Sequence, residues 1–206
     1  MDQVREKPWL AHYDPGVPPE IQVPDIPLWR FLEESARRFP QNVALEFLGK
    51  TLSYQELWGL ARRFAQGLKD LGVRPGDRVA IMLPNSPQFV IAFYGTLLAG
   101  GVGVNVNPLY TPRELRHQLA DAGAETLVIL DHLLPRYLEV EKEVPVKRVV
   151  VTGIKDFLPF PKNLLYPLKA KRDGLPLGFP KREGFHAFAE LLKRPPAEPH
   201  VPDPED

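Results

Sequence analysis

The sequence contains no cysteine among its 206 residues. A disulfide framework, a thiolate nucleophile and a thiolate metal site are therefore excluded. The five histidines show no metal-ligand spacing: His12, His117, His132, His186 and His200. We therefore expect a cytoplasmic protein in which no residue binds a metal ion.

An excess of charge of either sign is also missing, since 26 lysines and arginines balance 26 aspartates and glutamates. Without a global basic field, nucleic acid is not an expected partner. The N-terminus carries Asp2 and Arg5 without an apolar stretch behind them, so we expect no secretory signal.

One stretch, Val79 to Pro112, has no charged residue and is long enough to span a bilayer. It is interrupted by Pro84-Asn85-Ser86-Pro87-Gln88 and again by a cluster of glycine, asparagine and proline. The apolar pieces that remain are too short to cross a membrane. We therefore interpret the stretch as a buried strand and helix.

Proline divides the chain into three parts, because most of the 24 prolines fall in residues 1–27 and 153–206. We expect residues 1–152 to form an α/β subdomain, with 1–27 as a proline-rich N-terminal extension. Residues 153–206 are expected to be an irregular segment.

The folded part is expected to begin with a helix and a hairpin. In DIPLWRFLEESARRF, Asp25 is the expected N-cap, and one helical face collects Leu28, Phe31, Leu32, Ser35 or Ala36, and Phe39. The following VALEFLGKTLSY contains two strand-like runs. Gly49-Lys50 between them suits a type II′ turn.

A second helix is expected from Ser53, because Ser53 and Glu56 have the spacing of a capping box. Its apolar positions recur every three to four residues until Gly72, where a glycine ends the helix.

From Arg78 onward, strand-like and helix-like segments alternate, with strands starting near residues 78, 102, 126 and 148. Four strands alternating with three helices predict a parallel, doubly wound sheet flanked by helices. The predicted fold class is therefore α/β.

The segment LLAGGVGVNVNPLYTPREL contains a glycine cluster that could be taken for a phosphate loop. We expect Gly100 and Gly101 to end a helix with positive φ, and Gly103 to allow close backbone approach within a strand. A dinucleotide fingerprint needs a third glycine where Val106 stands and must follow a strand, whereas this cluster precedes one. The Gly-x4-Gly-Lys-Ser/Thr phosphate loop is also absent from the sequence.

Thr111, Pro112 and Glu114 predict the next helix start. Such an N-terminus can hold an anion, but its own capping box uses the donors, so we favour capping over ligand binding at Thr111. Ser35, Ser53 and Ser86 are likewise interpreted as ordinary or capping serines, because no histidine is adjacent to them in sequence. We interpret Tyr110 as a packed loop aromatic, and assign the other aromatics at helical spacing to the core: Trp58, Phe64, Phe89, Phe93 and Tyr94.

Several segments together resemble the AMP-forming acyl-CoA ligases, and specifically their bacterial long-chain fatty-acid branch. LSYQEL is similar to the first core motif of this family. GDRVAIMLPNSPQFVIAFYGTLLAGG, followed by NVNPLYTPREL, is similar to the second. The opening WLAHYDPGVPPEI is similar to the N-terminal extension of the fatty-acid branch, and the resemblance is nearly continuous from Trp9 to about Thr152.

The resemblance implies the fold of the family's N-terminal subdomain. It also implies a whole enzyme that uses ATP, Mg²⁺ and coenzyme A to convert a fatty acid to acyl-CoA, AMP and pyrophosphate. The family's phosphate loop ending in Pro-Lys-Gly, its adenine and ribose motifs and its C-terminal catalytic lysine are absent from these 206 residues. We therefore assign no catalytic, cofactor-binding or metal-binding residue and expect the chain alone to be inactive and to bind no cofactor.

Two interpretations of the whole chain stay open. In the first, it is the N-terminal part of a ligase, as a truncation or one half of a split protein, and its partner is the remainder of the enzyme. In the second, it is a free-standing binding module or homodimer derived from that fold.

The segment Phe157–Arg172, FLPFPKNLLYPLKAKR, mixes bulky apolar residues with lysine and arginine. This composition is typical of segments that contact a membrane surface. We expect Pro159, Pro161 and Pro167 to interrupt a continuous helix, which favours a packing excursion or a disordered linker over peripheral membrane contact.

Overall fold

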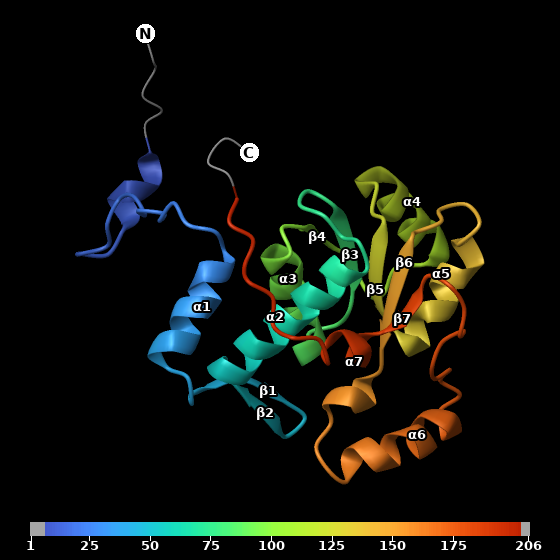
Figure 1. Ribbon diagram of the computed structural model, residues 1–206. Helices are drawn as coiled ribbons and strands as arrows, with labels where there is room; N and C mark the ends of the chain where they lie inside the picture. The colour runs from blue at the N-terminus through green and yellow to red at the C-terminus, as the bar shows by residue number, and fades with distance from the viewer. Residues whose placement is uncertain (1–6, 203–206) are drawn as a thin grey trace.

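The centre of the molecule is a parallel sheet built from the most apolar runs of the chain. The runs VAIM, LVIL and VVVT lie in the strands β3 (Arg78–Met82), β5 (Thr126–Leu130) and β6 (Arg148–Thr152). All five residues of β5 are buried, as expected for a strand covered on both faces. The structure is a computed structural model that describes residues 7–202, shown in Figure 1.

The sheet has five strands in the order β4-β3-β5-β6-β7, and every neighbouring pair is parallel. The two edges are β4 (Val102–Asn105) and β7 (Phe185–Ala187). The chain moves from β3 outward to β4 and then returns past β3 to β5. The sheet therefore has a switch point between β3 and β5, where successive connections run in opposite directions.

Four helices cover the sheet in two pairs. On one side, α2 (Tyr54–Asp70) packs along α3 (Pro87–Leu98), and on the other, α4 (Pro112–Ala122) packs along α5 (Leu134–Val140). Right-handed crossovers in both directions from the switch point place the pairs on opposite faces. The predicted doubly wound α/β fold is confirmed.

The helix before the sheet begins later than the sequence predicted. Helix α1 (Trp29–Arg38) has Leu28 as its N-cap, without a side-chain hydrogen bond, so the prediction of Asp25 as the cap is wrong. Its buried residues are Trp29, Leu32 and Ala36, while Leu28, Phe31 and Phe39 are about half exposed. The ring of Trp29 lies 6.5 Å from that of Trp58, and this contact with α2 selects the buried face.

The predicted hairpin is present, but its turn lies one residue earlier. Strands β1 (Val43–Phe47) and β2 (Lys50–Ser53) pair antiparallel, with Phe47 opposite Lys50. The two turn residues are therefore Leu48 and Gly49, whose φ angles of 52° and 94° are both positive. This is a type I′ turn rather than the predicted II′, since I′ needs positive φ at both positions.

Both predicted capping boxes form. The backbone N–H of Ser53 donates to Glu56 Oε2 at 2.8 Å, and the backbone N–H of Glu56 donates to Ser53 Oγ at 3.2 Å. The same two bonds join Thr111 and Glu114. The helices that follow are α2 and α4. After α2, Gly72 has the positive φ of 82° predicted for the residue that ends the helix.

Residues 153–202 are more regular than their proline content predicted. They form the 3₁₀ turn η3 (Ile154–Phe157), helix α6 (Lys162–Arg172), strand β7 and helix α7 (Phe188–Leu191). Helix α6 continues through Pro167, and Pro159 and Pro161 precede it, so the expected interruption is wrong. Strand β7 joins the sheet through β6, which corrects the expectation of an irregular segment.

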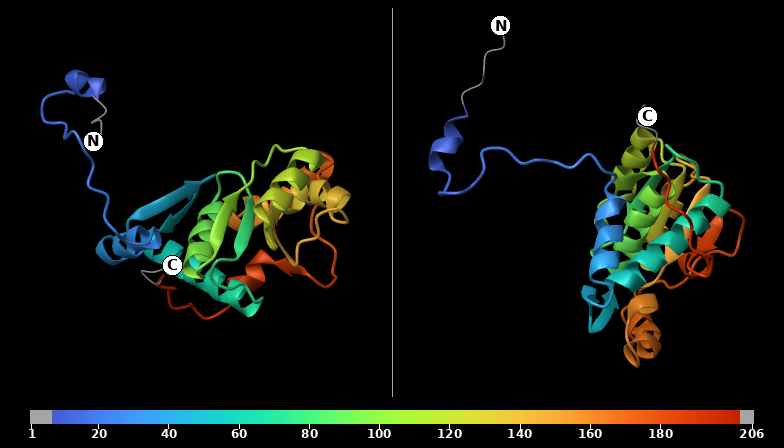
Figure 2. Two further views of the ribbon diagram at one scale, coloured as in Figure 1. Left: turned by 90° about the horizontal axis from the view of Figure 1, so that it is seen from above. Right: turned by 60° about the vertical axis from the view of Figure 1, so that its left-hand side comes forward.

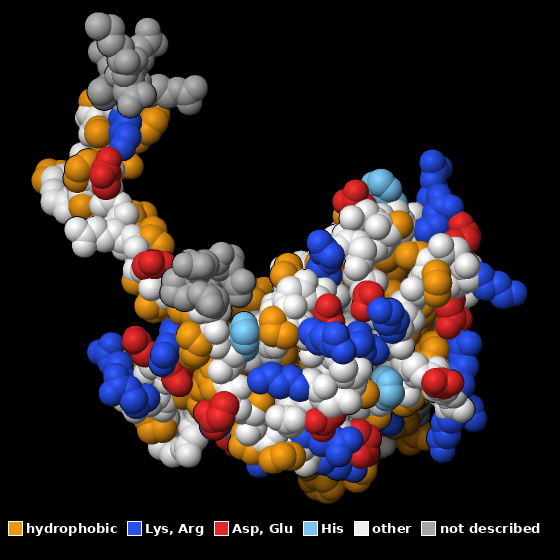
Figure 3. Space-filling view, turned by 45° about the horizontal axis from the view of Figure 1, so that its top comes forward, with side chains coloured by type: hydrophobic (Ala, Val, Ile, Leu, Met, Phe, Trp, Pro, Cys, Tyr) orange, Lys and Arg blue, Asp and Glu red, His pale blue; other side chains and the backbone are white. Residues whose placement is uncertain are grey.

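The N-terminal segment from η1 (Pro8–His12) to Pro27 extends away from the body in both views of Figure 2. Positive and negative side chains are interspersed on the face in Figure 3. Within residues 7–202, no helix combines the length and hydrophobicity needed to cross a membrane.

Candidate functional site at the carboxyl edge of the sheet

The switch point between β3 and β5 identifies one edge of the sheet as a candidate site. In open parallel sheets, ligands bind outside the carboxyl ends of the strands where the connections diverge. Here β3 leads into Ser86, the N-cap of α3, and β5 leads into Asp131 in the 3₁₀ turn η2 (Asp131–Leu133).

Asp131 is a carboxylate that is only 4% exposed. Its two oxygens accept backbone hydrogen bonds from the N–H of His132, at 2.8 Å, and of Gly178, at 3.3 Å. The imidazole Nδ1 of His132 lies 3.7 Å from Asp131 Oδ1, which is too long for a hydrogen bond. Asp131 therefore ties the end of β5 to the loop before β7.

Gln88 extends this polar group from the first turn of α3. Its side chain is fully buried, and its Nε2 donates to the carbonyl of Gly153 at 3.0 Å. The N–H of Gly153 and the hydroxyl of Thr152 both donate to Asp156 Oδ2 at 2.9 Å. We call Gln88, Asp131, Thr152, Gly153 and Asp156 the edge cluster.

The edge cluster is tightly closed. A Cβ atom added to Gly153 would lie 3.0 Å from Asp131 Oδ2, closer than nine in ten real Cβ contacts. Two buried atoms, Gln88 Oε1 in the cluster and His132 Nδ1 next to Asp131, have no hydrogen-bond partner within residues 7–202. The Gln88 amide, whose Nε2 is bonded to Gly153, therefore presents one unpaired polar atom to this region.

The chemistry of the edge cluster does not fit a triphosphate. Its ionisable members are two carboxylates, whereas phosphate groups need lysine, arginine or free N–H donors. The nearby N-terminus of α3 is already capped by Ser86, whose Oγ lies 3.4 Å from the N–H of Phe89. Across the described part of the chain, no three His, Asp or Glu side chains are grouped to hold a metal ion.

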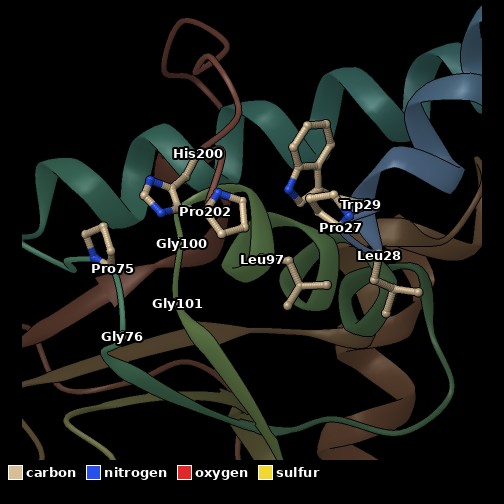
Figure 4. A pocket seen from close by; sticks show the side chains of 10 residues that line it. All are labelled: Pro27, Leu28, Trp29, Pro75, Gly76, Leu97, Gly100, Gly101, His200 and Pro202. Atoms are coloured by element: carbon tan, nitrogen blue, oxygen red, sulfur yellow. The ribbon is translucent and has the colours of Figure 1, made fainter. Parts of the chain in front are cut away.

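The glycine cluster has a structural role at the opposite, amino edge of the sheet. Gly100 has a φ of 85°, as predicted, and a Cβ atom there would lie 2.8 Å from His200 Cδ2. Figure 4 shows Gly100 and Gly101 beneath His200, in a hollow of about 550 Å³. Gly100 therefore ends α3 and leaves space for the segment around His200.

The expectations for the other two glycines are wrong. Gly101 does not have a positive φ. A Cβ there would lie 3.1 Å from the carbonyl oxygen of Asp77, so the position requires a residue without a side chain. A Cβ on Gly103 would make ordinary contacts of 3.5 Å with Phe93, so no close backbone approach occurs there.

The serine and threonine candidates are explained by local bonds. Ser53, Ser86 and Thr111 cap helices, and the hydroxyl of Ser35 donates to the carbonyl of Phe31 at 2.7 Å. A shallow hollow of about 730 Å³ adjoins Thr111, but the threonine hydroxyl is bonded to Glu114 at 2.8 Å. These contacts support capping.

The aromatic candidates pack as expected. Tyr110 lies against the core, and Arg136 Nη1 donates to its carbonyl oxygen at 3.1 Å and to that of Pro108 at 2.6 Å. Phe64 is fully buried, with its ring 4.6 Å from Phe188 of α7. The other four aromatics are partly buried against the same core: Trp58, Phe89, Phe93 and Tyr94.

Two shifted pKa values belong to side chains of residues 153–202. Burial raises the pKa of Tyr166 above its usual range, and the negative charges of Asp131 and Asp173 add to this effect. Burial lowers the pKa of His186, with a further contribution from the positive charge of Arg148. Both shifts favour the neutral side chain.

Comparison with known proteins decides the family of the chain. Residues 32–206 match the family model described as AMP-binding enzyme. The chain belongs to this family. It is 43% identical over 189 residues to a long-chain-fatty-acid–CoA ligase of Bacillus subtilis (strain 168), covering 92% of this chain and 34% of that protein. The chain thus spans about a third of that relative's length.

Further relatives agree. A long-chain-fatty-acid–CoA ligase of Escherichia coli O157:H7 is 40% identical over 163 residues, which is 78% of this chain and 29% of that protein. A solved long-chain-fatty-acid-CoA ligase (FadD1) from Archaeoglobus fulgidus superposes with a TM-score of 0.70 over 91% of this chain and 34% of that chain. At 23% identity it shows the fold alone.

The edge cluster was not predicted from the sequence. Its signals are a glutamine in an otherwise apolar helix, Gln88, and an aspartate directly after an apolar strand, Asp131. The contacts that unite them are made with backbone atoms of Gly153 and Gly178. Such contacts leave no pattern of residue types in the sequence.

Proposed function

We propose that this chain is the N-terminal part of a long-chain fatty-acid–CoA ligase, an enzyme that joins a fatty acid to coenzyme A at the expense of ATP. The observation that carries the proposal is the 43% identity to such a ligase over 92% of the chain. Because the chain covers 34% of that relative, we assign it a part of the enzyme rather than the whole.

The role of this part is that of a scaffold. The described residues form the doubly wound sheet, and the edge cluster holds the carboxyl ends of its central strands in fixed positions. Since the cluster does not fit a triphosphate, we assign the adenylation chemistry to the remainder of the enzyme. ATP, Mg²⁺, coenzyme A and the fatty acid are ligands of the complete ligase in this proposal.

We also propose that residues 1–152 are the N-terminal subdomain and that residues 153–206 lead toward the ATP-binding part. Within its described residues the second segment is held to the body at two places, since β7 pairs with β6 and the N–H of His200 donates to the carbonyl of Leu98 at 2.9 Å. A connecting segment fixed in this way would present the ATP-binding part in a defined orientation.

A complementation experiment tests the proposed function. The 206-residue chain is mixed with a separately purified remainder of the Bacillus subtilis relative, and fatty-acid-dependent exchange of pyrophosphate into ATP is measured. We expect no exchange from either piece alone and clear exchange from the mixture with palmitate. A stable complex of the two folded pieces without exchange would contradict the proposal.

A second candidate is a free-standing binding or dimerisation module. It is favoured by exposed apolar residues in the N-terminal segment, where Ile21 is 86% exposed and Val23 is 83% exposed. Analytical ultracentrifugation separates the candidates. Concentration-dependent dimerisation that Ile21→Ser and Val23→Ser abolish would support the module.

A further inference from the structure

Helix α6 carries a row of exposed apolar side chains. Leu164, Leu165 and Leu168 are 65%, 57% and 69% exposed, and Phe160, just before the helix, is 79% exposed. Positions 164 and 168 are four residues apart, so they lie along one side of the helix, with Leu165 beside them. Phe160 lies outside the helix, two residues before its first residue, Lys162. We call these four residues the leucine face.

The charged residues of the segment 157–172, which contains the leucine face, are all basic. Residues 157–172 contain Lys162, Lys169, Lys171 and Arg172 and no acidic residue, although the whole chain has no net charge. The first acidic residue after them, Asp173, lies 3.3 Å from the guanidinium of Arg172. The segment therefore combines exposed apolar side chains with a local excess of positive charge.

The opposite side of α6 fixes the helix to the body. Ala170 is buried, and Lys162 Nζ donates to the carbonyl of Leu48 at the hairpin tip, at 2.8 Å. Figures 1 and 2 show α6 outside the two helix layers, far from the N-terminal segment. The leucine face therefore points outward from a fixed and accessible helix.

We propose that the leucine face docks on an anionic phospholipid surface, with the leucines among the acyl chains and with Lys169 and Lys171 at the headgroups. Exposed apolar residues rimmed by basic ones are the combination that interfacial helices use. A second copy of the chain is a poorer occupant, because a twofold contact would bring the same cations together. The proposal goes beyond the proposed function and does not depend on it.

Vesicle sedimentation tests the proposal without ATP or fatty acid. The 206-residue chain is mixed with vesicles of phosphatidylcholine alone, or of phosphatidylcholine with one quarter phosphatidylglycerol. We expect binding to the anionic vesicles that weakens with added salt, and little binding to the neutral ones. Absence of binding to the anionic vesicles would overturn the proposal.

Paired variants locate the contact. Leu164→Glu with Leu168→Glu should weaken binding on the order of 100-fold, because anions replace two leucines that the proposal places among the acyl chains. The matched control Leu109→Glu changes a leucine that is 81% exposed on a loop elsewhere, and should bind like the unchanged chain. Equal binding by the α6 variant and the control would overturn the proposal.

The basic residues have their own pair of variants. Lys169→Gln with Lys171→Gln should weaken binding roughly 25-fold, since each lysine near an anionic surface contributes about fivefold. The control Lys142→Gln, on the α5 side of the molecule, should leave binding unchanged. Far-UV circular dichroism confirms that each variant remains folded.

Two results would identify a different occupant and thereby overturn the proposal. Dimerisation that the α6 variant abolishes, measured by sedimentation velocity without lipid, would assign the leucine face to a second copy. Vesicle binding that disappears when the remainder of the ligase is added would assign it to a contact inside the complete enzyme.

Discussion

Alanine substitutions at two glycines of helix α2 should have opposite effects on stability. Gly59 and Gly67 lie in the same helix, but a Cβ atom on Gly59 would meet nothing within 4 Å. A Cβ on Gly67 would lie 2.5 Å from Cβ and Cγ of Leu191 and 2.9 Å from its Cα. The contact with a backbone atom means that α7 must move to accept the methyl group.

The magnitudes follow from the two environments. Glycine in a helix interior is less stable than alanine by about 0.5–1 kcal/mol, so Gly59→Ala should raise the free energy of unfolding by that amount. Gly67→Ala gains the same helix-propensity stabilisation, but the overpacking against Leu191 costs about 1–3 kcal/mol. The cost should lie at the upper end of this range because the backbone of α7 must shift. We expect a net loss of about 1–2 kcal/mol, and a difference between the variants of roughly 2–3 kcal/mol.

Urea unfolding followed by far-UV circular dichroism measures this difference. With a slope of about 1–3 kcal/mol per molar urea, the midpoints should differ by roughly 1 M. Leu191→Ala in the Gly67→Ala background should cost less than Leu191→Ala alone, because the two side chains compete for the same space. Equal stabilisation by Gly59→Ala and Gly67→Ala would refute the packing of α7 against α2.

Four other perturbations have definite expected outcomes. Ser53→Ala and Thr111→Ala should each lower the free energy of unfolding by about 1 kcal/mol in urea titrations, because each removes a helix cap. His186 has a lowered pKa in the folded protein, so the unfolded state binds the proton more readily. The free energy of unfolding should therefore fall as the pH decreases below 6.5, the ordinary pKa of histidine. His186→Gln should reduce this decline. Arg148→Met should raise the pKa of His186 in an NMR titration, and a pKa that stays constant would exclude the charge effect. Gly100→Ala should destabilise the chain by about 1–3 kcal/mol, through its positive φ and the contact with His200.

Much of the fold could be predicted because its signals are local. The capping boxes at Ser53 and Thr111 are spacings of three residues, and each helix begins where the spacing indicates. The alternation of apolar strands and helices after Arg78 likewise predicted four strands of the sheet and their direction.

The features that were missed depend on distant partners. Strand β7 has three residues with His186 at its centre, and it exists because β6 offers a parallel edge. The buried face of α1 was misjudged because Trp58 of α2 selects Trp29, whereas periodicity alone also accepts Phe31.

The candidate site was the least predictable part. The edge cluster joins Gln88 to the backbone of Gly153, which is 65 residues away, and Asp131 to that of Gly178, which is 47 residues away. A backbone acceptor exists at every position and a donor at every residue except proline, so no residue type marks the ones that are used. The absence of a recognisable phosphate loop, in contrast, could be established directly from the sequence.

The segment 194–197, which is hydrogen-bonded to the side chains of α2, has a consequence for synthesis on the ribosome. Arg63 Nη1 donates to the carbonyl of Arg194, 131 residues later, and Arg62 Nε donates to that of Ala197. At about 5–20 residues per second, translation needs on the order of ten seconds to supply these acceptors. During that interval the outer surface of α2 is uncovered in the nascent chain, which makes it a natural site for chaperone contact.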